Sequence, residues 1–158
     1  MVNLARKSES TVGSIVQQIN EEHKVLRQTL SDIEHKLDTL FIEKPEDITK
    51  LVALFQTLHD HLEKHFALEE SEPSFAEVGS ENTYLVSGLK DLFKDHALFL
   101  RLSADLTNLC LHQIEIGVFS LKIIKKQYAA LKGLLREHDA KETKLFIDAN
   151  YIEIGGEG

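Results

Sequence analysis

Leucine, isoleucine, valine and phenylalanine recur along the chain at intervals of three and four residues. This spacing places them on one face of an α-helix, because a helix completes a turn in about 3.6 residues. The repeat runs through four segments, at about residues 11–40, 45–72, 82–112 and 118–149. Four amphipathic segments of similar length with short connections predict an all-α fold, an up-down-up-down four-helix bundle.

Proline and glycine mark the ends of these segments. Pro45 suits the first turn of the second helix, where Glu46 and Asp47 favour the positive end of the helix dipole. Pro73 should stop that helix, because proline lacks the amide hydrogen that a helix interior needs. The stretch "PSFAEVGSEN" is then a connector, and a further break is expected near "IEIGVFS".

We expect the 158 residues to form a single domain. Its helical core should cover about residues 12–149, between a flexible N-terminus (1–10) and a frayed tail (150–158).

Each predicted helix carries ionisable residues inside its apolar stripe. In the first helix His23 lies within a run of aliphatic residues, and in the third His96 does the same. The second and fourth stripes each contain a histidine followed four residues later by a glutamate. Six polar residues therefore occupy core-type positions, namely His23, His65, Glu69, His96, His138 and Glu142.

These residues repeat along the chain. His23 and His65 are 42 residues apart, as are His96 and His138. An offset of 73 residues superposes the first half of the set on the second half, including Glu69 on Glu142. We interpret this repeat as two helix pairs related by a pseudo-twofold axis.

The His-x-x-x-Glu spacing brings both side chains to one face of a helix. A buried carboxylate without a partner costs several kcal/mol, so it should become neutral or bind a cation. Two carboxylates and four imidazoles can be satisfied together by a dinuclear metal site in the core of the bundle. The nitrogen and oxygen donors suit iron, zinc, copper or nickel, and paired carboxylates in a bundle are typical of di-iron and di-manganese proteins.

Composition excludes several other classes of function. The formal net charge of -8 argues against binding to nucleic acid or to an anionic membrane surface. The single cysteine, Cys110, excludes an internal disulfide and a multi-cysteine metal site. No apolar leader and no run of 18 apolar residues is present, so a soluble, cytoplasmic protein is expected.

The pieces "EEHKVLR", "HFALEE", "KDHALFLR" and "REHDAKETKLF" together resemble the hemerythrin-like family, also called the HHE cation-binding domain. The resemblance implies a four-helix bundle around a non-haem di-iron centre of two iron ions, with room for an oxo bridge. Zinc and manganese are alternative occupants. Carried over by motif, the terminal ligands would be His23, His65, His96 and His138, and the bridging ligands Glu69 and Glu142.

Two positions depart from the oxygen-carrying members of that family. Those proteins have a second histidine one turn after the first on the third helix, where this chain has Leu100. Their fourth helix also has a longer histidine-to-acid spacing than His138-x-x-x-Glu142. The set of four histidines and two glutamates is more similar to the di-iron domain of iron-centre repair proteins.

The resemblance implies a protein that binds or senses oxygen, nitric oxide or peroxide, or that handles iron. A di-iron oxidoreductase or an iron-centre repair activity is one alternative, and an iron-responsive interaction module is another. Whether the protein is an enzyme stays open at this point, and its protein partner is unknown.

Further polar residues are weaker candidates. His61 is one turn before His65 and is considered as an extra ligand, and Tyr128 as an outer partner of the site. The acids directly before three of the histidines (Glu22, Asp95 and Glu137) are either outer partners of the imidazoles or solvated charges.

Overall fold

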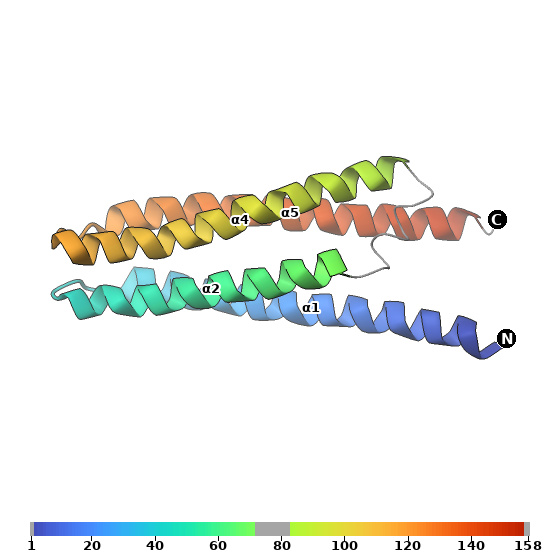
Figure 1. The fold of residues 1–158 in the computed structure, drawn as a ribbon, viewed down its shortest axis with the longest axis horizontal. Helices are drawn as coiled ribbons and strands as arrows, with labels where there is room; N and C mark the ends of the chain where they lie inside the picture. Colours follow the sequence, from blue (N-terminus) through green and yellow to red (C-terminus); the bar gives the residue numbers. More distant parts are fainter. Residues whose placement is uncertain (1, 72–82, 157–158) are drawn as a thin grey trace.

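The computed structural model describes the backbone of residues 2–71 and 83–156, and the side chains of residues 17–18, 20–70 and 87–145. The described backbone forms four helices and no strand: α1 (Val2–Thr39), α2 (Pro45–Ser71), α4 (Thr83–Ile116) and α5 (Leu121–Gly156). Figure 1 shows α2 and α4 side by side at the front of the bundle, with α1 and α5 behind them. The all-α four-helix bundle predicted from the apolar stripes is confirmed. The predicted connector at residues 73–82 lies outside the described residues.

Two helices extend further than the apolar stripes predicted. The backbone of α1 is helical from Val2, and that of α5 continues to Gly156. Residues 2–10 contain neither proline nor glycine, and the chain after residue 149 reaches its first glycine at Gly155. Since nothing in these segments breaks a helix, the helices continue beyond the amphipathic region.

The connection between α4 and α5 is short and well defined. α4 ends at Ile116, and the next residue, Gly117, has a φ of 69°, a left-handed conformation that glycine adopts without strain. The buried side chain of Gln113 accepts a hydrogen bond from the Ser120 amide (3.0 Å) and donates one to the Ser120 carbonyl (3.2 Å). This amide side chain therefore fixes the point at which α5 begins.

An apolar core fills the half of the bundle next to the two short loops, which join α1 to α2 and α4 to α5. Its fully buried members include Ile33, Leu51, Phe55, Leu58, Leu106 and Ile124. Cys110 belongs to this core, and burial raises the pKa of its thiol to about 12, so it is a small apolar residue rather than a reactive one. Leu100, the position that departs from the oxygen carriers, packs against the same core.

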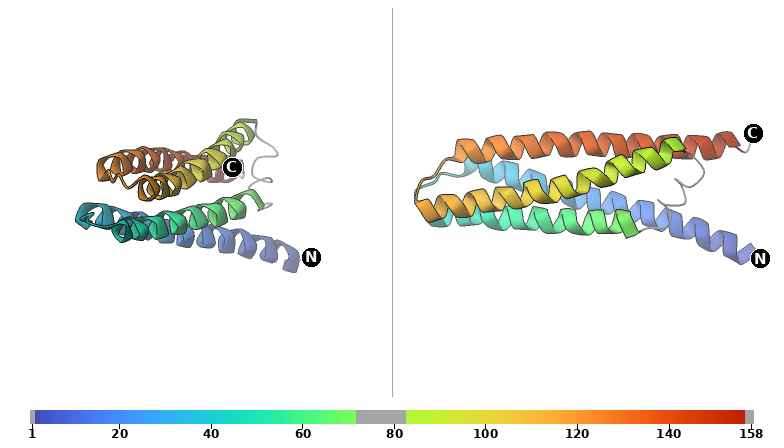
Figure 2. Two further views of the ribbon diagram at one scale, coloured as in Figure 1. Left: turned by 60° about the vertical axis from the view of Figure 1, so that its left-hand side comes forward. Right: turned by 45° about the horizontal axis from the view of Figure 1, so that its top comes forward.

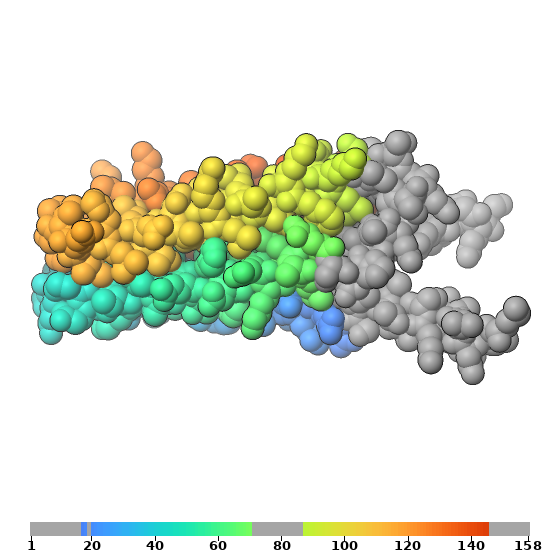
Figure 3. All heavy atoms as spheres, in the orientation of Figure 1, coloured from blue at the N-terminus to red at the C-terminus, as the bar shows by residue number. Residues whose placement is uncertain are grey.

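The four helices do not approach one another equally. The backbone of α1 packs on α2, α2 packs on α4, and α4 packs on α5, whereas α1 and α5 approach each other less closely. Figure 2 shows that α1 and α5 diverge toward the end of the bundle that carries the two chain termini. On the opposite face the side chains of α2 and α4 form a continuous surface (Figure 3). Within the described residues, no helix combines the length and apolar character that crossing a membrane requires.

Candidate metal centre

The six polar residues that interrupt the apolar stripes meet inside the bundle. Each helix supplies one histidine, and α2 and α5 each add a glutamate one turn later. Five of the six side chains are between 2% and 5% exposed, whereas His23 is 19% exposed. The structure therefore brings together every residue that the sequence predicted for this site, and it buries the set asymmetrically.

Glu69 lies between a histidine of each half of the chain. One of its oxygens, Oε1, is 2.6 Å from His65 Nε2, and the other, Oε2, is 3.0 Å from His96 Nε2. Glu69 thus presents one oxygen to each half of the pseudo-symmetric set.

Glu142 occupies the equivalent position on the other side. Its Oε1 is 3.7 Å from His23 Nε2, and its Oε2 is 3.8 Å from His138 Nε2. Two clusters of donor atoms result, each within 4.8 Å: one holds His23, His65, Glu69 and Glu142, and the other holds Glu69, His96 and His138. The two clusters share Glu69, so two adjacent cations could be bound with a carboxylate between them.

Several atoms of this cluster lack the hydrogen bonds that buried polar atoms normally make. Among the described residues, five such atoms have no hydrogen-bond partner: Glu69 Oε1, His96 Nε2, His138 Nε2 and both carboxylate oxygens of Glu142. Glu69 Oε1 and His96 Nε2 do lie close to other polar atoms, but not in hydrogen-bonding geometry. Unpaired buried oxygens and imidazole nitrogens that face one another are the donor set of a cation site, so a metal ion fits here.

A carboxylate also lies behind each of the four imidazoles. Two such partners come from residues directly before a histidine, and both bind across to the next helix. Glu22 Oε2 is 3.0 Å from His65 Nδ1, and Asp95 Oδ2 is 3.4 Å from His138 Nδ1. Their interpretation as solvated charges is therefore wrong, and the outer-partner alternative holds for both. Glu137, by contrast, is exposed.

The other two carboxylates were missed by the sequence analysis. Glu70 Oε1 accepts a hydrogen bond from His96 Nδ1 at 2.9 Å, and Asp139 Oδ1 lies 3.7 Å from His23 Nδ1. Both directly follow a member of the six in sequence, which was the available signal. An Nδ1–H that points at a carboxylate leaves the Nε2 lone pair directed into the centre, which is the tautomer a metal needs.

The two halves of the centre have different surroundings. The Glu22–His65 contact recurs as Asp95–His138 at the offset of 73 residues, but the other two outer contacts do not repeat. Phe66 occupies the position equivalent to Asp139 and stacks on His96, with ring centroids 3.9 Å apart and an interplanar angle of 9°. Aromatic rings therefore cover the His96 side, whereas the His23 side ends in a charged, partly exposed residue.

The two glutamates have opposite tendencies to ionise. Burial opposes ionisation of Glu69, but the contacts with His65 and His96 outweigh burial and lower its pKa. Burial raises the pKa of Glu142 to about 10, and the negative charge of Glu69 adds to this shift. Without a cation, these surroundings therefore favour the ionised form of Glu69 and the protonated form of Glu142.

The two weaker candidates lie away from the centre. His61 Nδ1 is hydrogen-bonded to Thr29 Oγ1 at 3.0 Å, and His61 belongs to neither donor cluster. The Tyr128 hydroxyl lies 3.2 Å from both the Leu30 carbonyl and Glu34 Oε1. Each is a buried or half-buried polar group that is paired within the bundle.

Comparison with known proteins gives one family. A family model described as the hemerythrin HHE cation binding domain matches residues 14–149, which is most of the chain. No curated protein and no solved structure matches the chain.

We expect Glu142 to be protonated in the metal-free protein at neutral pH. Infrared difference spectra between the wild type and Glu142→Gln should contain the band of a protonated carboxyl group, and this band should disappear as pH rises through about 10. Glu137→Gln is the matched control, because Glu137 is an exposed residue on the same helix.

The same shift predicts how the stability of the metal-free protein depends on pH. The pKa of Glu142 in the folded state lies above its ordinary value of 4.5. Its contribution to the free energy of unfolding is therefore complete below about pH 4.5 and is lost as pH rises toward about 10. Chemical denaturation measures the free energy of unfolding, and in the Glu142→Gln variant this energy should not fall over the same pH range. The protonated state assigned to Glu142 would be contradicted if the infrared spectrum of the wild type at pH 7 lacked the band of a protonated carboxyl group.

Proposed function

Because the chain belongs to the hemerythrin HHE cation-binding family, we propose that it is a non-haem di-iron protein that binds a small ligand such as oxygen, nitric oxide or peroxide. Binding would serve to sense the ligand or to handle iron. The observation that carries the proposal is that each buried glutamate lies between a histidine of the first half and a histidine of the second half.

Each iron would have two histidines and would share both carboxylates. His23 and His65, whose Nε2 atoms lie 3.1 Å apart, would hold the first iron, and His96 and His138 the second. Glu69 and Glu142 would supply the carboxylates that the two metals share. The outer carboxylates would fix the orientation of the imidazoles and increase their basicity.

The donor set supports iron. It contains nitrogen and oxygen and no thiolate, since Cys110 lies in the apolar core. Paired carboxylates projecting inward from a helix bundle are typical of di-iron and di-manganese proteins. Zinc and manganese remain alternative occupants, because imidazole and carboxylate bind both. Bound iron would supply a redox-active centre that can exchange ligands.

The His23 side is the route by which an external ligand would reach the centre. A cavity of about 370 Å³ adjoins the cluster there, and its lining includes His23, His65, His138 and Glu142. His96 is instead covered by Phe66 and lies close to Phe93. A small molecule would therefore approach the iron held by His23 and His65.

That cavity also favours a second candidate function, a di-iron oxidoreductase. Cavities of about 300–1,000 Å³ are the usual size of small-molecule sites, so an organic substrate has room beside the centre. Sustained turnover with an added reductant would favour the enzyme, whereas one reaction per centre would favour the sensor or iron-handling protein.

Glu142→Ala should lower metal retention by more than about tenfold, because the loss of even an outer partner of a ligand typically costs about ten- to a hundredfold in affinity. Glu137→Ala, at an exposed position on the same helix, should retain the wild-type metal content. Metal analysis after dialysis against a weak chelator measures both. Equal losses in the two variants would contradict the ligand assignment.

The iron(II) protein should change its visible absorption when nitric oxide, oxygen or peroxide is added under otherwise anaerobic conditions. The metal-free protein and the Glu142→Ala variant serve as controls and should not respond. An iron-loaded protein that responds to none of the three ligands would contradict the proposed function while leaving metal binding intact.

A further inference from the structure

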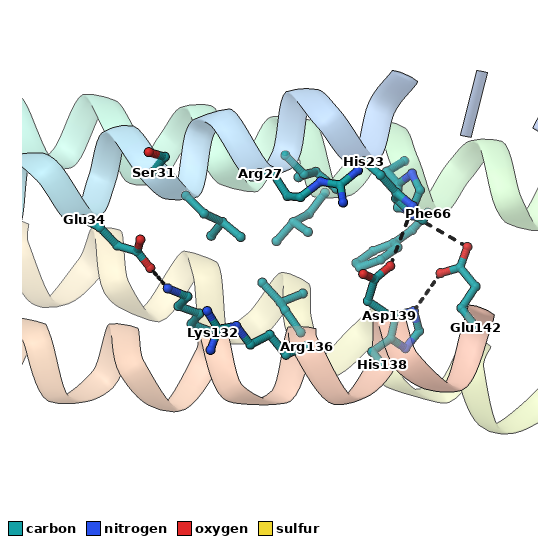
Figure 4. Close-up of a pocket in the computed structure, with 15 residues that line it drawn as sticks. His23, Arg27, Ser31, Glu34, Phe66, Lys132, Arg136, His138, Asp139 and Glu142 are labelled. Atoms are coloured by element: carbon teal, nitrogen blue, oxygen red, sulfur yellow. Dashed lines mark hydrogen bonds and ion pairs between the residues drawn. The ribbon is translucent and has the colours of Figure 1, made fainter. Parts of the chain in front are cut away.

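A cavity lies along the seam between α1 and α5, the pair of adjacent helices that approach each other least closely. One end of it reaches the candidate metal centre at His23 and Glu142. From there it extends past four leucines toward Glu34 on α1 and Lys132 on α5. Figure 4 shows the side chains of both helices pointing into this space.

Polar contacts cross the seam at both ends of the cavity. At the end near the metal centre, His23 on α1 faces Asp139 on α5, with 3.7 Å between Nδ1 and Oδ1. At the far end, Lys132 on α5 is paired with Glu34 on α1, and the Tyr128 hydroxyl donates to the same Glu34 oxygen. The charge of Lys132 is therefore already compensated.

Two arginines lie between these contacts. Arg27 follows His23 by one turn on α1, and Arg136 follows Lys132 by one turn on α5, so both side chains line the middle of the cavity (Figure 4). Among the described residues, neither guanidinium makes an ion pair or a hydrogen bond. The seam thus carries two guanidinium groups that no described carboxylate pairs with, in a cavity that Asp139 also lines and in a chain whose net charge is -8.

The wall behind the arginines is apolar. It is formed by Leu26, Leu30, Leu62, Leu135 and Phe66. A ligand that fits this arrangement has a negative group for the guanidiniums and an apolar body for the leucines. Guanidinium groups bind carboxylates with paired, charge-assisted hydrogen bonds, and apolar contact with the wall adds the hydrophobic contribution.

We propose that this cavity binds a small organic carboxylate with an apolar chain, its charged group held by Arg27 and Arg136 and its chain by the leucines behind them. The site goes beyond the proposed function, because none of the groups that would bind the carboxylate is a candidate metal ligand. It would place the bound molecule next to the exposed edge of the metal centre, at His23.

Isothermal titration calorimetry with octanoate tests the proposal, on metal-loaded and on metal-free protein. The wild type should bind octanoate, and the double variant Arg27→Gln/Arg136→Gln should bind it at least about tenfold more weakly. Arg101→Gln is the matched control, because Arg101 is an exposed arginine on α4 away from the cavity. Metal content should be the same in all three proteins.

Two further probes separate the contributions of charge and chain. Octanol carries the same chain without the charge, and inorganic phosphate carries charge without a chain, so both should bind more weakly than octanoate. The proposal is overturned if the wild type does not bind octanoate, if the double variant binds it equally well, or if octanol or phosphate binds as tightly. None of these results depends on the proposed reaction with oxygen, nitric oxide or peroxide.

Discussion

The structure depends on the burial of two carboxylates among four imidazoles in the middle of a helix bundle. Glu69 and Glu142 are each about 2% exposed, and a buried charge without compensation is among the most costly features a fold can contain. The imidazoles compensate only one of the two, since the pKa of Glu69 is lowered while that of Glu142 is raised to about 10. A pair of cations would allow both carboxylates to ionise, which ties metal binding to folding.

The two halves of the bundle contain different kinds of buried residues. The half next to the short loops is an apolar core, with Phe55 and Leu58 among its fully buried residues. The other half holds the polar cluster, and here the two pseudo-symmetric sides differ. Phe66 covers the imidazole of His96, whereas the seam between α1 and α5 leaves a cavity beside His23. This asymmetry makes one side of a symmetric donor set accessible.

Much of this arrangement could be predicted from the sequence, because helical periodicity assigns each residue to a face. The intrusion of His23 or Glu142 into an aliphatic stripe therefore located the centre. Contacts that depend on the rotation of neighbouring helices were harder to predict. Glu70 and Asp139 bind imidazoles on other helices, and the cavity depends on how far α1 and α5 are separated. The start of α1 at Val2 was not predicted, because the prediction followed the apolar stripe, whereas a helix without a breaker continues beyond its stripe.

Whether the six residues form a dinuclear iron site is best measured by the elemental metal content per chain. The protein would be expressed with added iron and purified without chelator. A dinuclear centre formed by these residues should give about two irons per chain, the stoichiometry of carboxylate-bridged centres in helix bundles. No iron, or a single zinc ion per chain, would contradict it and would mean that the buried carboxylates are compensated in another way.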